Sequence, residues 1–415
     1  MMLSWEYPPR IVGGIARHVE EISWALARMP GVEVHVVTCA FPGAPMEEVY
    51  QGVHIHRVTP YEAPGGYNDF VHWVHQLNAA MRDRAWTLCQ EWLTELLSDR
   101  ACKDPKQLPA QSGIVLHVHD WLAYFAGVQL KHAFKLPLVA TIHATEFGRN
   151  NGIHSDISRY IHSIEKDLVT EAWRVIVCSG FMKGEIEYAL QAPQDKIDII
   201  YNGIHTEKFE FDFPLEEARA FRCQYAAPYE KMILFVGRGV REKGAHILIE
   251  AFPKVRQGYH DVKLVMAGGG YRKHLEDRAH ALGIWQNVYF TGFVPDDVLL
   301  RLYKVADVAC FPSLYEPFGI VALEAMASHT PVVVSDAGGL PEVVEADVTG
   351  TVTWLNNPDS LAWGLLRVLH NPQFAREMAE RAYQKCKTVF NWDRIAEQTH
   401  DVYTRVWSEY QVSAW

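Results

Sequence analysis

The sequence has no cysteine pattern typical of a disulfide framework or of a zinc cluster. Its 7 cysteines are scattered along 415 residues, their number is odd, and no Cys-x-x-Cys pair occurs. Regular or paired spacing is the usual signature of both kinds of site. Its absence excludes a small disulfide-stabilised fold and favours a reducing, cytoplasmic location.

A membrane-crossing segment, a surplus of basic residues and internal repeats are also missing. No apolar run is long enough to cross a bilayer, and the N-terminal MMLSWEYPPR has neither the basic nor the apolar region of a signal peptide. A formal net charge of −11 argues against a nucleic-acid partner. With 49% hydrophobic and 21% charged residues, the chain is expected to form two or three packed domains.

What the chain does contain is a regular alternation of short apolar runs and amphipathic helical patterns. Strand–helix–strand repetition implies parallel sheets with right-handed crossovers, so we predict an α/β protein with two doubly wound, Rossmann-like domains. The first would cover residues 1–205 and the second 206–391. The predicted strands are 32–40, 52–58, 113–120, 136–144, 174–179, 196–202, 231–238, 262–270, 287–294, 306–313, 330–339 and 350–354.

Two segments depart from this alternation. Only MMLSW precedes the first glycine loop, so the first strand is either very short or begins before the given sequence. Residues 60–112 form a long insertion, in which apolar residues at helical spacing predict a pair of core-facing helices. These residues are Phe70, Val74, Leu77, Met81, Trp92 and Leu96.

The segment EYPPRIVGGIARHV has features of an anion-binding loop. Two prolines favour an extended loop, and Gly13 and Gly14 then open a helix. Glycine lets the backbone approach a ligand, and a helix N-terminus offers N–H groups to an anion. The spacing is not Gly-x-Gly-x-x-Gly, so no dinucleotide fingerprint is present. A tight turn without a ligand is the alternative.

Polar residues follow two predicted strands of the first domain. His119 and Asp120 end LHVHD, and His143, Thr145 and Glu146 lie in TIHATE. Ligands of open parallel sheets bind outside the carboxyl ends of the strands, where all five residues would lie. The chain has 20 histidines, so a purely structural role for either imidazole stays open.

Three segments of the second domain carry charged residues or glycines at strand ends. In GRGVREKG, Arg238 and Lys243 could bind one diphosphate or merely form a solvated loop. In SLYEPFGIVALEAMA, Glu316 and Glu324 flank a helix start near Phe318. They belong either to a capped helix with a buried, paired glutamate or to a site for a polar ligand. The third segment is a turn with Ser335, Gly338 and Gly339.

Taken in order, GG, HDW, TIH, YNGI, GR…EKG and EPFGIVALEAMA resemble the retaining GT-B glycosyltransferases of family 4, including glycogen synthases and sucrose-phosphate synthases. The resemblance covers nearly the whole chain. It implies that the second domain binds a nucleotide sugar, that the first binds the acceptor, and that the two face a central cleft. It also implies that the C-terminal helix, residues 392–415, packs back on the first domain.

The resemblance assigns roles to residues that match the family motifs. Arg238 and Lys243 would bind the donor diphosphate, Glu324 the ribose and Glu316 the transferred hexose. His143 would lie near the C6 hydroxyl of the sugar, with Asp120 close by. The remaining donor contacts would come from Gly13 and Gly14 near the distal phosphate, from Val294 near the base, and from the backbone of Phe318, Gly319, Ile320 and Val321.

The same resemblance implies a hexosyltransferase that uses UDP- or ADP-glucose with retention. No cofactor and no metal ion is expected, and the Pro-Asp-Asp at 295–297 is interpreted as a helix N-cap. The acceptor would be a sugar, a sugar phosphate or a glucan. Glycogen synthases commonly have lysine where this chain has Ile11, which slightly favours a small or phosphorylated acceptor. Candidate acceptor residues are Arg10, Arg17, His119, Thr145, Arg149 and Arg159.

Two other functions stay open at this point. A nucleotide-sugar epimerase can share the GT-B architecture, and a silent subunit could bind the donor without reaction. The HDW, TIH and EPFG motifs argue against the first, and the intact charged residues argue against the second. The sequence leaves the oligomeric state open.

Overall fold

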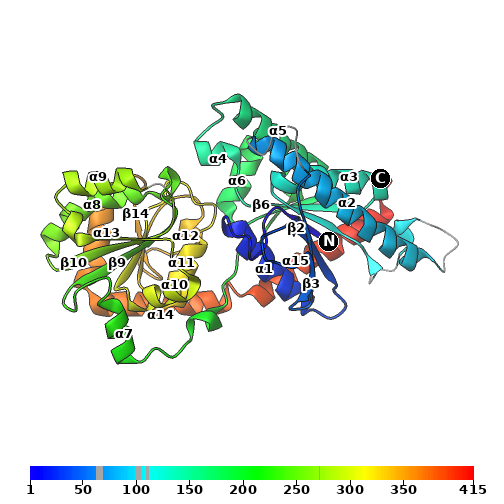
Figure 1. The fold of residues 1–415 in the computed structure, drawn as a ribbon. Helices are drawn as coiled ribbons and strands as arrows, with labels where there is room; N and C mark the ends of the chain where they lie inside the picture. The colour runs from blue at the N-terminus through cyan, green and yellow to red at the C-terminus, as the bar shows by residue number, and fades with distance from the viewer. Residues whose placement is uncertain (62–68, 99–103, 109–111, 271) are drawn as a thin grey trace. The chain divides into compact units, whose positions relative to one another are not determined.

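The structure is a computed structural model that describes residues 1–61, 69–98, 104–108, 112–270 and 272–415 (Figure 1). It divides into two compact units. Unit 1 comprises residues 1–202 and 392–415, and unit 2 comprises residues 203–391. The sequence-based boundary at 205/206 lies three residues after this division.

Unit 1 contains an eight-stranded sheet in the order β3-β4-β2-β1-β5-β6-β7-β8. All neighbouring strands are parallel except β3 and β4, which pair antiparallel. The chain progresses to one side from β1 to β2 and to the other side from β5 onward. The strands are β1 Met2–Ser4, β2 Val34–Cys39, β3 Glu47–Tyr50, β4 Val53–Val58, β5 Leu116–His119, β6 Leu138–Ile142, β7 Arg174–Val177 and β8 Ile197–Ile199.

Strand β3 is absent from the sequence-based prediction. It is an exposed edge strand whose four residues, Glu47–Tyr50, lack an apolar face to bury. This strand is held in place by its pairing with β4. Because neither of its faces is buried, its sequence shows no alternation of apolar and polar residues that would predict a strand. Strand β1 has three residues, Met2–Ser4, so the short strand that was one of the two alternatives for MMLSW is observed.

In the described part of the long insertion, the residues with apolar spacing lie in one α-helix, α2 over Phe70–Leu97, so the predicted helix pair is wrong. Residues 70–97 contain neither glycine nor proline, so neither residue interrupts the backbone hydrogen bonds of this helix. The Asp69 carboxylate caps the helix by accepting from the N–H groups of Val71 and His72. Val74, Leu77 and Met81 are buried as predicted, whereas Phe70 is half exposed.

The C-terminal helix α15, Trp392–Val412, belongs to unit 1. Its residues Ile395, Val402 and Val406 are buried in the same cluster as Ile22 and Leu26 of α1. The other helices of unit 1 are α1 Gly14–Ala27, α3 Tyr124–Phe134, α4 Glu146–Asn150, α5 Asp156–Glu171 and α6 Gly180–Ala189.

Unit 2 contains a six-stranded, fully parallel sheet in the order β11-β10-β9-β12-β13-β14, with helices on both faces (Figure 1). The strands are β9 Lys231–Val236, β10 Val262–Ala267, β11 Val288–Gly292, β12 Val308–Phe311, β13 Val332–Ser335 and β14 Thr351–Thr353. The helices are α7 Leu215–Arg222, α8 Ala245–Gly258, α9 Lys273–Ala281, α10 Asp296–Val305, α11 Ile320–Ala327, α12 Leu340–Val343, α13 Pro358–His370 and α14 Pro372–Thr388.

The Pro-Asp-Asp segment lies at the start of α10, where the sequence interpretation placed a helix N-cap. Pro295 occupies the N-cap of α10, while Asp296 and Asp297 lie in its first turn. Carboxylates in a first turn still interact favourably with the positive end of the helix dipole. The pair therefore has a structural position, as the sequence indicated, but is not the cap itself.

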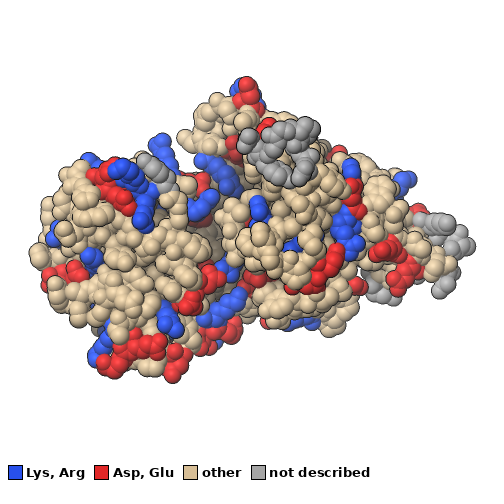
Figure 2. All heavy atoms as spheres, in the orientation of Figure 1, with Lys and Arg blue, Asp and Glu red and all other residues tan. Residues whose placement is uncertain are grey.

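The fold is thus α/β, with two Rossmann-like units. Both signs of charge occur over each unit on the face shown in Figure 2. Among the described residues, none of the helices combines the length and the apolar character that crossing a bilayer requires.

Candidate active site

Three loops at the carboxyl ends of β9, β12 and β13 interlock in unit 2. Gly244 has φ +69°, and a Cβ added there would lie 1.7 Å from the carbonyl oxygen of Pro312. Leu314 donates its backbone N–H to the carbonyl oxygen of Glu242 at 2.7 Å. These contacts hold the segment 241–244 directly against the loop that precedes α11.

The turn after β13 supports the same loop from the other side. Gly339 donates its N–H to the carbonyl oxygen of Glu316 at 2.8 Å, and a Cβ at Gly338 would lie 2.1 Å from that oxygen. Ser335 donates from Oγ to the carbonyl oxygen of Ser313 at 2.6 Å. The turn predicted from Ser335, Gly338 and Gly339 therefore holds the backbone around Glu316 in place.

Glu316 and Lys243 form a largely buried ion pair on this rim. The Lys243 ammonium donates to Glu316 Oε2 at 2.7 Å, and the Ser313 hydroxyl donates to the same oxygen at 3.1 Å. Glu316 is only 7% exposed. Gly319, not Glu316, is the N-cap of α11, so the capping interpretation of Glu316 is wrong, whereas its buried pairing is observed.

The other predicted donor residues of unit 2 lie in different surroundings. Arg238 donates to Glu242 Oε1 at 2.9 Å, and its side chain is 50% exposed. Tyr303 donates its buried hydroxyl to Glu324 Oε2 at 2.9 Å, and burial raises the pKa of Tyr303 well above its ordinary value.

Four residues that were predicted to contact the donor through their backbone lie at the start of α11. Val294, the fifth, lies elsewhere. Phe318 is buried, Gly319 has φ +114°, and Ile320 and Val321 open the helix. Val294 follows β11, an edge strand separated from β12 by two strands. The structure thus groups Lys243 and Glu316 with the helix start. It leaves Arg238 in a half-exposed pair with Glu242 and places Val294 across the sheet.

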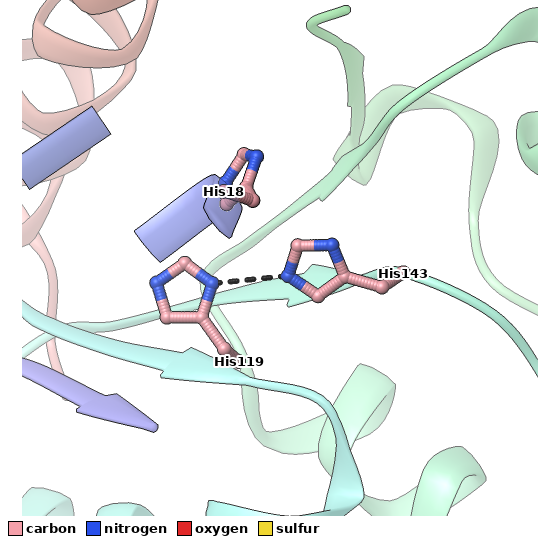
Figure 3. A group of neighbouring side chains, drawn as sticks. All are labelled: His18, His119 and His143. Carbon is pink, nitrogen blue, oxygen red and sulfur yellow. Dashed lines mark hydrogen bonds between the residues drawn. The ribbon is translucent and has the colours of Figure 1, made fainter. Parts of the chain in front are cut away.

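In unit 1, the predicted histidines follow neighbouring strands and meet. His119 ends β5 and His143 follows β6, and His119 Nδ1 lies 3.1 Å from His143 Nε2 (Figure 3). His18 of α1 joins them, with its ring centroid 4.7 Å from that of His143 and its Nδ1 2.7 Å from Asn202 Oδ1. Sequence reasoning missed His18, although its position in GGIARHV, four residues after the paired glycines, was a usable signal.

The one fully buried nitrogen of this cluster that lacks a hydrogen-bond partner indicates which ring nitrogens carry hydrogens. His119 Nε2 is buried and has no hydrogen-bond partner in the described part of the chain. An unpaired buried N–H costs more than an unpaired lone pair, so the hydrogen belongs on His119 Nδ1, which donates to His143 Nε2. His143 is then left with its hydrogen on Nδ1. Burial lowers the pKa of all three imidazoles, that of His18 to about 4.

The three imidazoles lie close enough to consider a metal ion, because one ring nitrogen of each lies within 4.8 Å of the others. The hydrogen bond between His119 and His143 occupies one nitrogen of each ring, and His18 uses Nδ1 with Asn202. An ion bound there would compete with these bonds, so the arrangement fits a hydrogen-bonded cluster better than a metal centre.

Asp120 is buried beneath these residues in an uncommon conformation. Its φ is +57°, and its Oδ1 accepts the backbone N–H of His143 at 2.7 Å. Burial raises the pKa of Asp120 to about 7, while the Arg149 guanidinium and the His143 N–H act in the opposite direction. The carboxyl thus holds the loop after β6 and changes charge near neutral pH.

This pKa predicts a dependence of stability on pH. The ordinary pKa of 3.8 applies to the unfolded chain, so protonated Asp120 stabilises the fold below pH 4, and this stabilisation is lost as pH rises to about 7. Between pH 5 and pH 8 the wild type should lose about 2–3 kcal/mol relative to Asp120→Asn, which keeps the acceptor oxygen without the charge. Urea unfolding of both proteins at both pH values measures this difference, and parallel pH profiles would contradict it.

The predicted glycine loop already has an anionic partner. Glu6 Oε2 accepts the backbone N–H groups of Val12 at 2.5 Å and of Gly13 at 3.0 Å. Gly13 is the N-cap of α1 and Gly14 its first residue. Glu6 is buried, and burial raises its pKa. The Glu6 carboxylate therefore occupies the helix start at which the sequence predicted an anionic ligand. Glu6 was not among the predicted residues.

The predicted acceptor residues are only partly brought together. The Arg10 guanidinium lies over the rings of Trp5 at 5.5 Å and Trp73 at 5.3 Å. Thr145 caps α4 by accepting from the N–H of Gly148, and its hydroxyl donates to Glu185. Arg17 lies in α1, and Arg149 lies in the last turn of α4, where its charge lowers the pKa of Asp120. Arg159 lies in α5, paired with Asp156 on the surface.

Comparisons with known proteins agree with the two-unit organisation. A family model described as "Glycosyl transferase 4-like domain" matches residues 13–203, and one described as "Glycosyl transferases group 1" matches residues 220–385. An uncharacterized glycosyltransferase of Methanocaldococcus jannaschii is 41% identical over 404 residues, covering 97% of both chains. A glycogen synthase of Mycobacterium tuberculosis is 34% identical over 412 residues, covering 97% of this chain and 94% of the relative.

Two solved structures share the fold. Sucrose-phosphate synthase from Thermosynechococcus elongatus aligns with a TM-score of 0.78 and 24% identity, covering 98% of both chains. The Anabaena protein HepE, solved in complex with UDP-glucose, aligns with a TM-score of 0.75 and 20% identity, covering 97% of this chain and 98% of HepE. At these identities the likeness establishes the architecture and leaves ligands to be argued from the residues.

Proposed function

Since this chain belongs to the GT-B glycosyltransferases of family 4, we propose that it is a hexosyltransferase that transfers the glucosyl group, with retention, from UDP- or ADP-glucose. The acceptor would be a sugar, a sugar phosphate or a glucan. The relatives named as glycogen synthase and sucrose-phosphate synthase support this range of acceptors.

The observation that carries the proposal is the Lys243–Glu316 pair beside the start of α11. An ammonium can donate three hydrogen bonds, and among the described residues Lys243 uses one of them, to Glu316. The remaining donors suit phosphate oxygens. Glu316 accepts through Oε2, so its Oε1 is available to accept from a sugar hydroxyl. A cation and a hydroxyl acceptor side by side match the junction of a diphosphate and a hexose.

The chemistry follows from the charge that develops as the anomeric C–O bond breaks. Negative charge accumulates on the departing nucleotide, and Lys243, Arg238 and the N-terminus of α11 would stabilise it. No enzyme nucleophile is assigned, so attack on the same face, assisted by the leaving phosphate, is the proposed route to retention. Glu324 would bind the ribose, and His143 and Asp120 would act on the hexose side. No step requires a metal ion.

An acceptor screen tests the proposed function. Purified full-length protein is incubated with UDP-glucose or ADP-glucose and with fructose 6-phosphate, glucose 1-phosphate or glycogen, and released UDP or ADP is measured. Release with one donor that rises at least about tenfold on adding one acceptor is expected, because uncatalysed donor cleavage is slow.

The other outcomes separate the alternatives. Conversion of the donor sugar without nucleotide release would indicate an epimerase. Donor binding without any turnover would indicate a silent subunit. If no donor is cleaved with any of these acceptors, the glucosyl assignment loses its support.

A further inference from the structure

His18 is the member of the imidazole cluster to which the proposed mechanism assigns no role. It lies in the second turn of α1, and only 6% of its surface is exposed. Its Nδ1 lies 2.7 Å from Asn202 Oδ1, and its ring stands edge-on to that of Trp392, with the two centroids 5.6 Å apart. Asn202, after β8, and Trp392, at the start of α15, thus hold the ring in one orientation.

The hydrogen positions of the cluster leave one donor and one acceptor unused. An amide oxygen only accepts, so His18 carries its hydrogen on Nδ1 and donates it to Asn202. Burial lowers the pKa of His18 to about 4, so at pH 7 the ring is neutral and Nε2 keeps a lone pair. His143 accepts from His119 through Nε2 and therefore carries its hydrogen on Nδ1.

Both unused atoms can be reached from outside. Neither His18 Nε2 nor His143 Nδ1 has a hydrogen-bond partner among the residues that the structure describes. Of the unpartnered ring nitrogens in the cluster, only His119 Nε2 is fully buried. The rings of His18 and His143 meet edge to face with centroids 4.7 Å apart (Figure 3). A small polar group can therefore approach a donor and an acceptor at once.

The spacing and the charge of this pair select a hydroxyl group. A hydroxyl both donates and accepts, and an oxygen bonded to two nitrogens at ordinary lengths holds them about 4–5 Å apart. One ring nitrogen of His18 lies within 4.8 Å of one of His143. A phosphate oxygen only accepts, so the lone pair of His18 would repel it. The pair therefore suits an uncharged sugar hydroxyl and disfavours an anion.

We propose that His18 binds, together with His143, the C6 hydroxyl of the transferred hexose: His18 Nε2 accepts its hydrogen, and His143 donates to its oxygen from Nδ1. This assignment rests on the proposed function, in which His143 acts on the hexose side. Both residues belong to the carboxyl edge of the sheet of unit 1, where ligands of open parallel sheets bind. His18 would thus favour hexoses that carry this hydroxyl over those that lack it.

Calorimetric titration with UDP-glucose and UDP-6-deoxyglucose, or with the ADP pair if the acceptor screen selects ADP, tests the proposal without requiring turnover. The wild type should bind the 6-deoxy donor at least about tenfold more weakly, because this donor leaves two nitrogens of the site unpaired.

Two variants of His18 separate its two ring nitrogens. His18→Asn keeps a donor for Asn202 but has no atom at the position of Nε2. It should reduce the preference for glucose to about threefold or less, because only the bond from His143 remains. His18→Gln places its amide near the position of Nε2 and should keep most of the preference, although it loses the bond to Asn202.

A purely structural role for His18 predicts a different pattern. If the imidazole only held α1 in place, either variant would weaken the binding of both donors by the same factor. Thermal unfolding shows whether the variants are folded. The matched control is His54→Asn, which removes another imidazole of unit 1, at the amino end of β4, and should leave both affinities unchanged.

The remaining outcomes separate this proposal from the proposed function. A wild type that binds both donors equally, or a preference for glucose that is unchanged in His18→Asn, overturns the role of His18 and leaves the proposed function in place. Binding of neither UDP-glucose nor ADP-glucose contradicts the proposed function, and the role of His18 with it.

Discussion

Replacing Lys243 with alanine is expected to lower kcat/KM for donor cleavage by about 10²–10³-fold, a loss of ~3–4 kcal/mol in transition-state stabilisation. The ammonium is held by Glu316 at 2.7 Å, and in the proposed mechanism its remaining hydrogens would bind phosphate oxygens of the donor. Removing it deletes a cation for the leaving group and leaves the Glu316 carboxylate buried without its partner. Steady-state kinetics of nucleotide release, with the acceptor found in the screen, measure this effect.

Lys254→Ala is the matched control. Lys254 also lies in unit 2 and also pairs with a carboxylate, that of Asp359, but both side chains are more than half exposed. Loss of such a surface pair typically costs less than about 1 kcal/mol, so its kinetics should equal those of the wild type. If Lys243→Ala keeps wild-type turnover and donor affinity, Lys243 does not belong to the mechanism.

Gly244→Ala should be the most damaging small substitution in unit 2. A residue with a side chain pays about 1–2 kcal/mol for the left-handed conformation that Gly244 adopts at φ +69°. The new methyl would lie 1.7 Å from the carbonyl oxygen of Pro312, and the resulting shift of the backbone adds about 1–3 kcal/mol. We therefore expect a loss of about 2–5 kcal/mol in unfolding free energy, measured by urea unfolding. Donor cleavage should fall at least tenfold, because Lys243 and Ser313 lie next to the two clashing residues.

Gly283→Ala separates the two contributions. Gly283 has nearly the same backbone angle, φ +68°, but a Cβ there would meet no atom within 4 Å. This variant should lose only the conformational part, about 1–2 kcal/mol, and keep full activity. Equal losses in the two variants would show that the contact with Pro312 has no energetic role.

Much of the fold was predictable because parallel strands are buried on both faces and read as apolar runs. Each predicted strand has an observed counterpart, and most observed strands are a few residues shorter than the predicted ones. In several of them the residues beyond the observed strand end are polar. In HVHDW, for example, β5 ends at His119, and Asp120 turns out of the sheet with φ +57°. The polar residues after the strands thus indicated where the site lies, but they also made the predicted strands too long.

The pairings within the site could not be predicted, because they depend on contacts between distant segments. Nothing local in the sequence says that Lys243 meets Glu316, 73 residues away, or that Glu6 closes the loop at Gly13. The single helix α2 was missed for a related reason, since apolar spacing does not reveal whether two helical stretches are continuous. Such facts follow only once the sheet order has fixed which loops are neighbours.

The carboxylate of Glu6 at the start of α1 affects which part of the chain can attract an anionic ligand. The positive end of that helix is already neutralised from within, so a dianion arriving there would gain little attraction unless Glu6 were first protonated or displaced. If the chain has the proposed function, holding a departing nucleotide would therefore fall mainly to the cations of residues 238–243. In this chain the loop with the paired glycines therefore contributes less to attracting a phosphate than to positioning the imidazole of His18, which follows on the same helix.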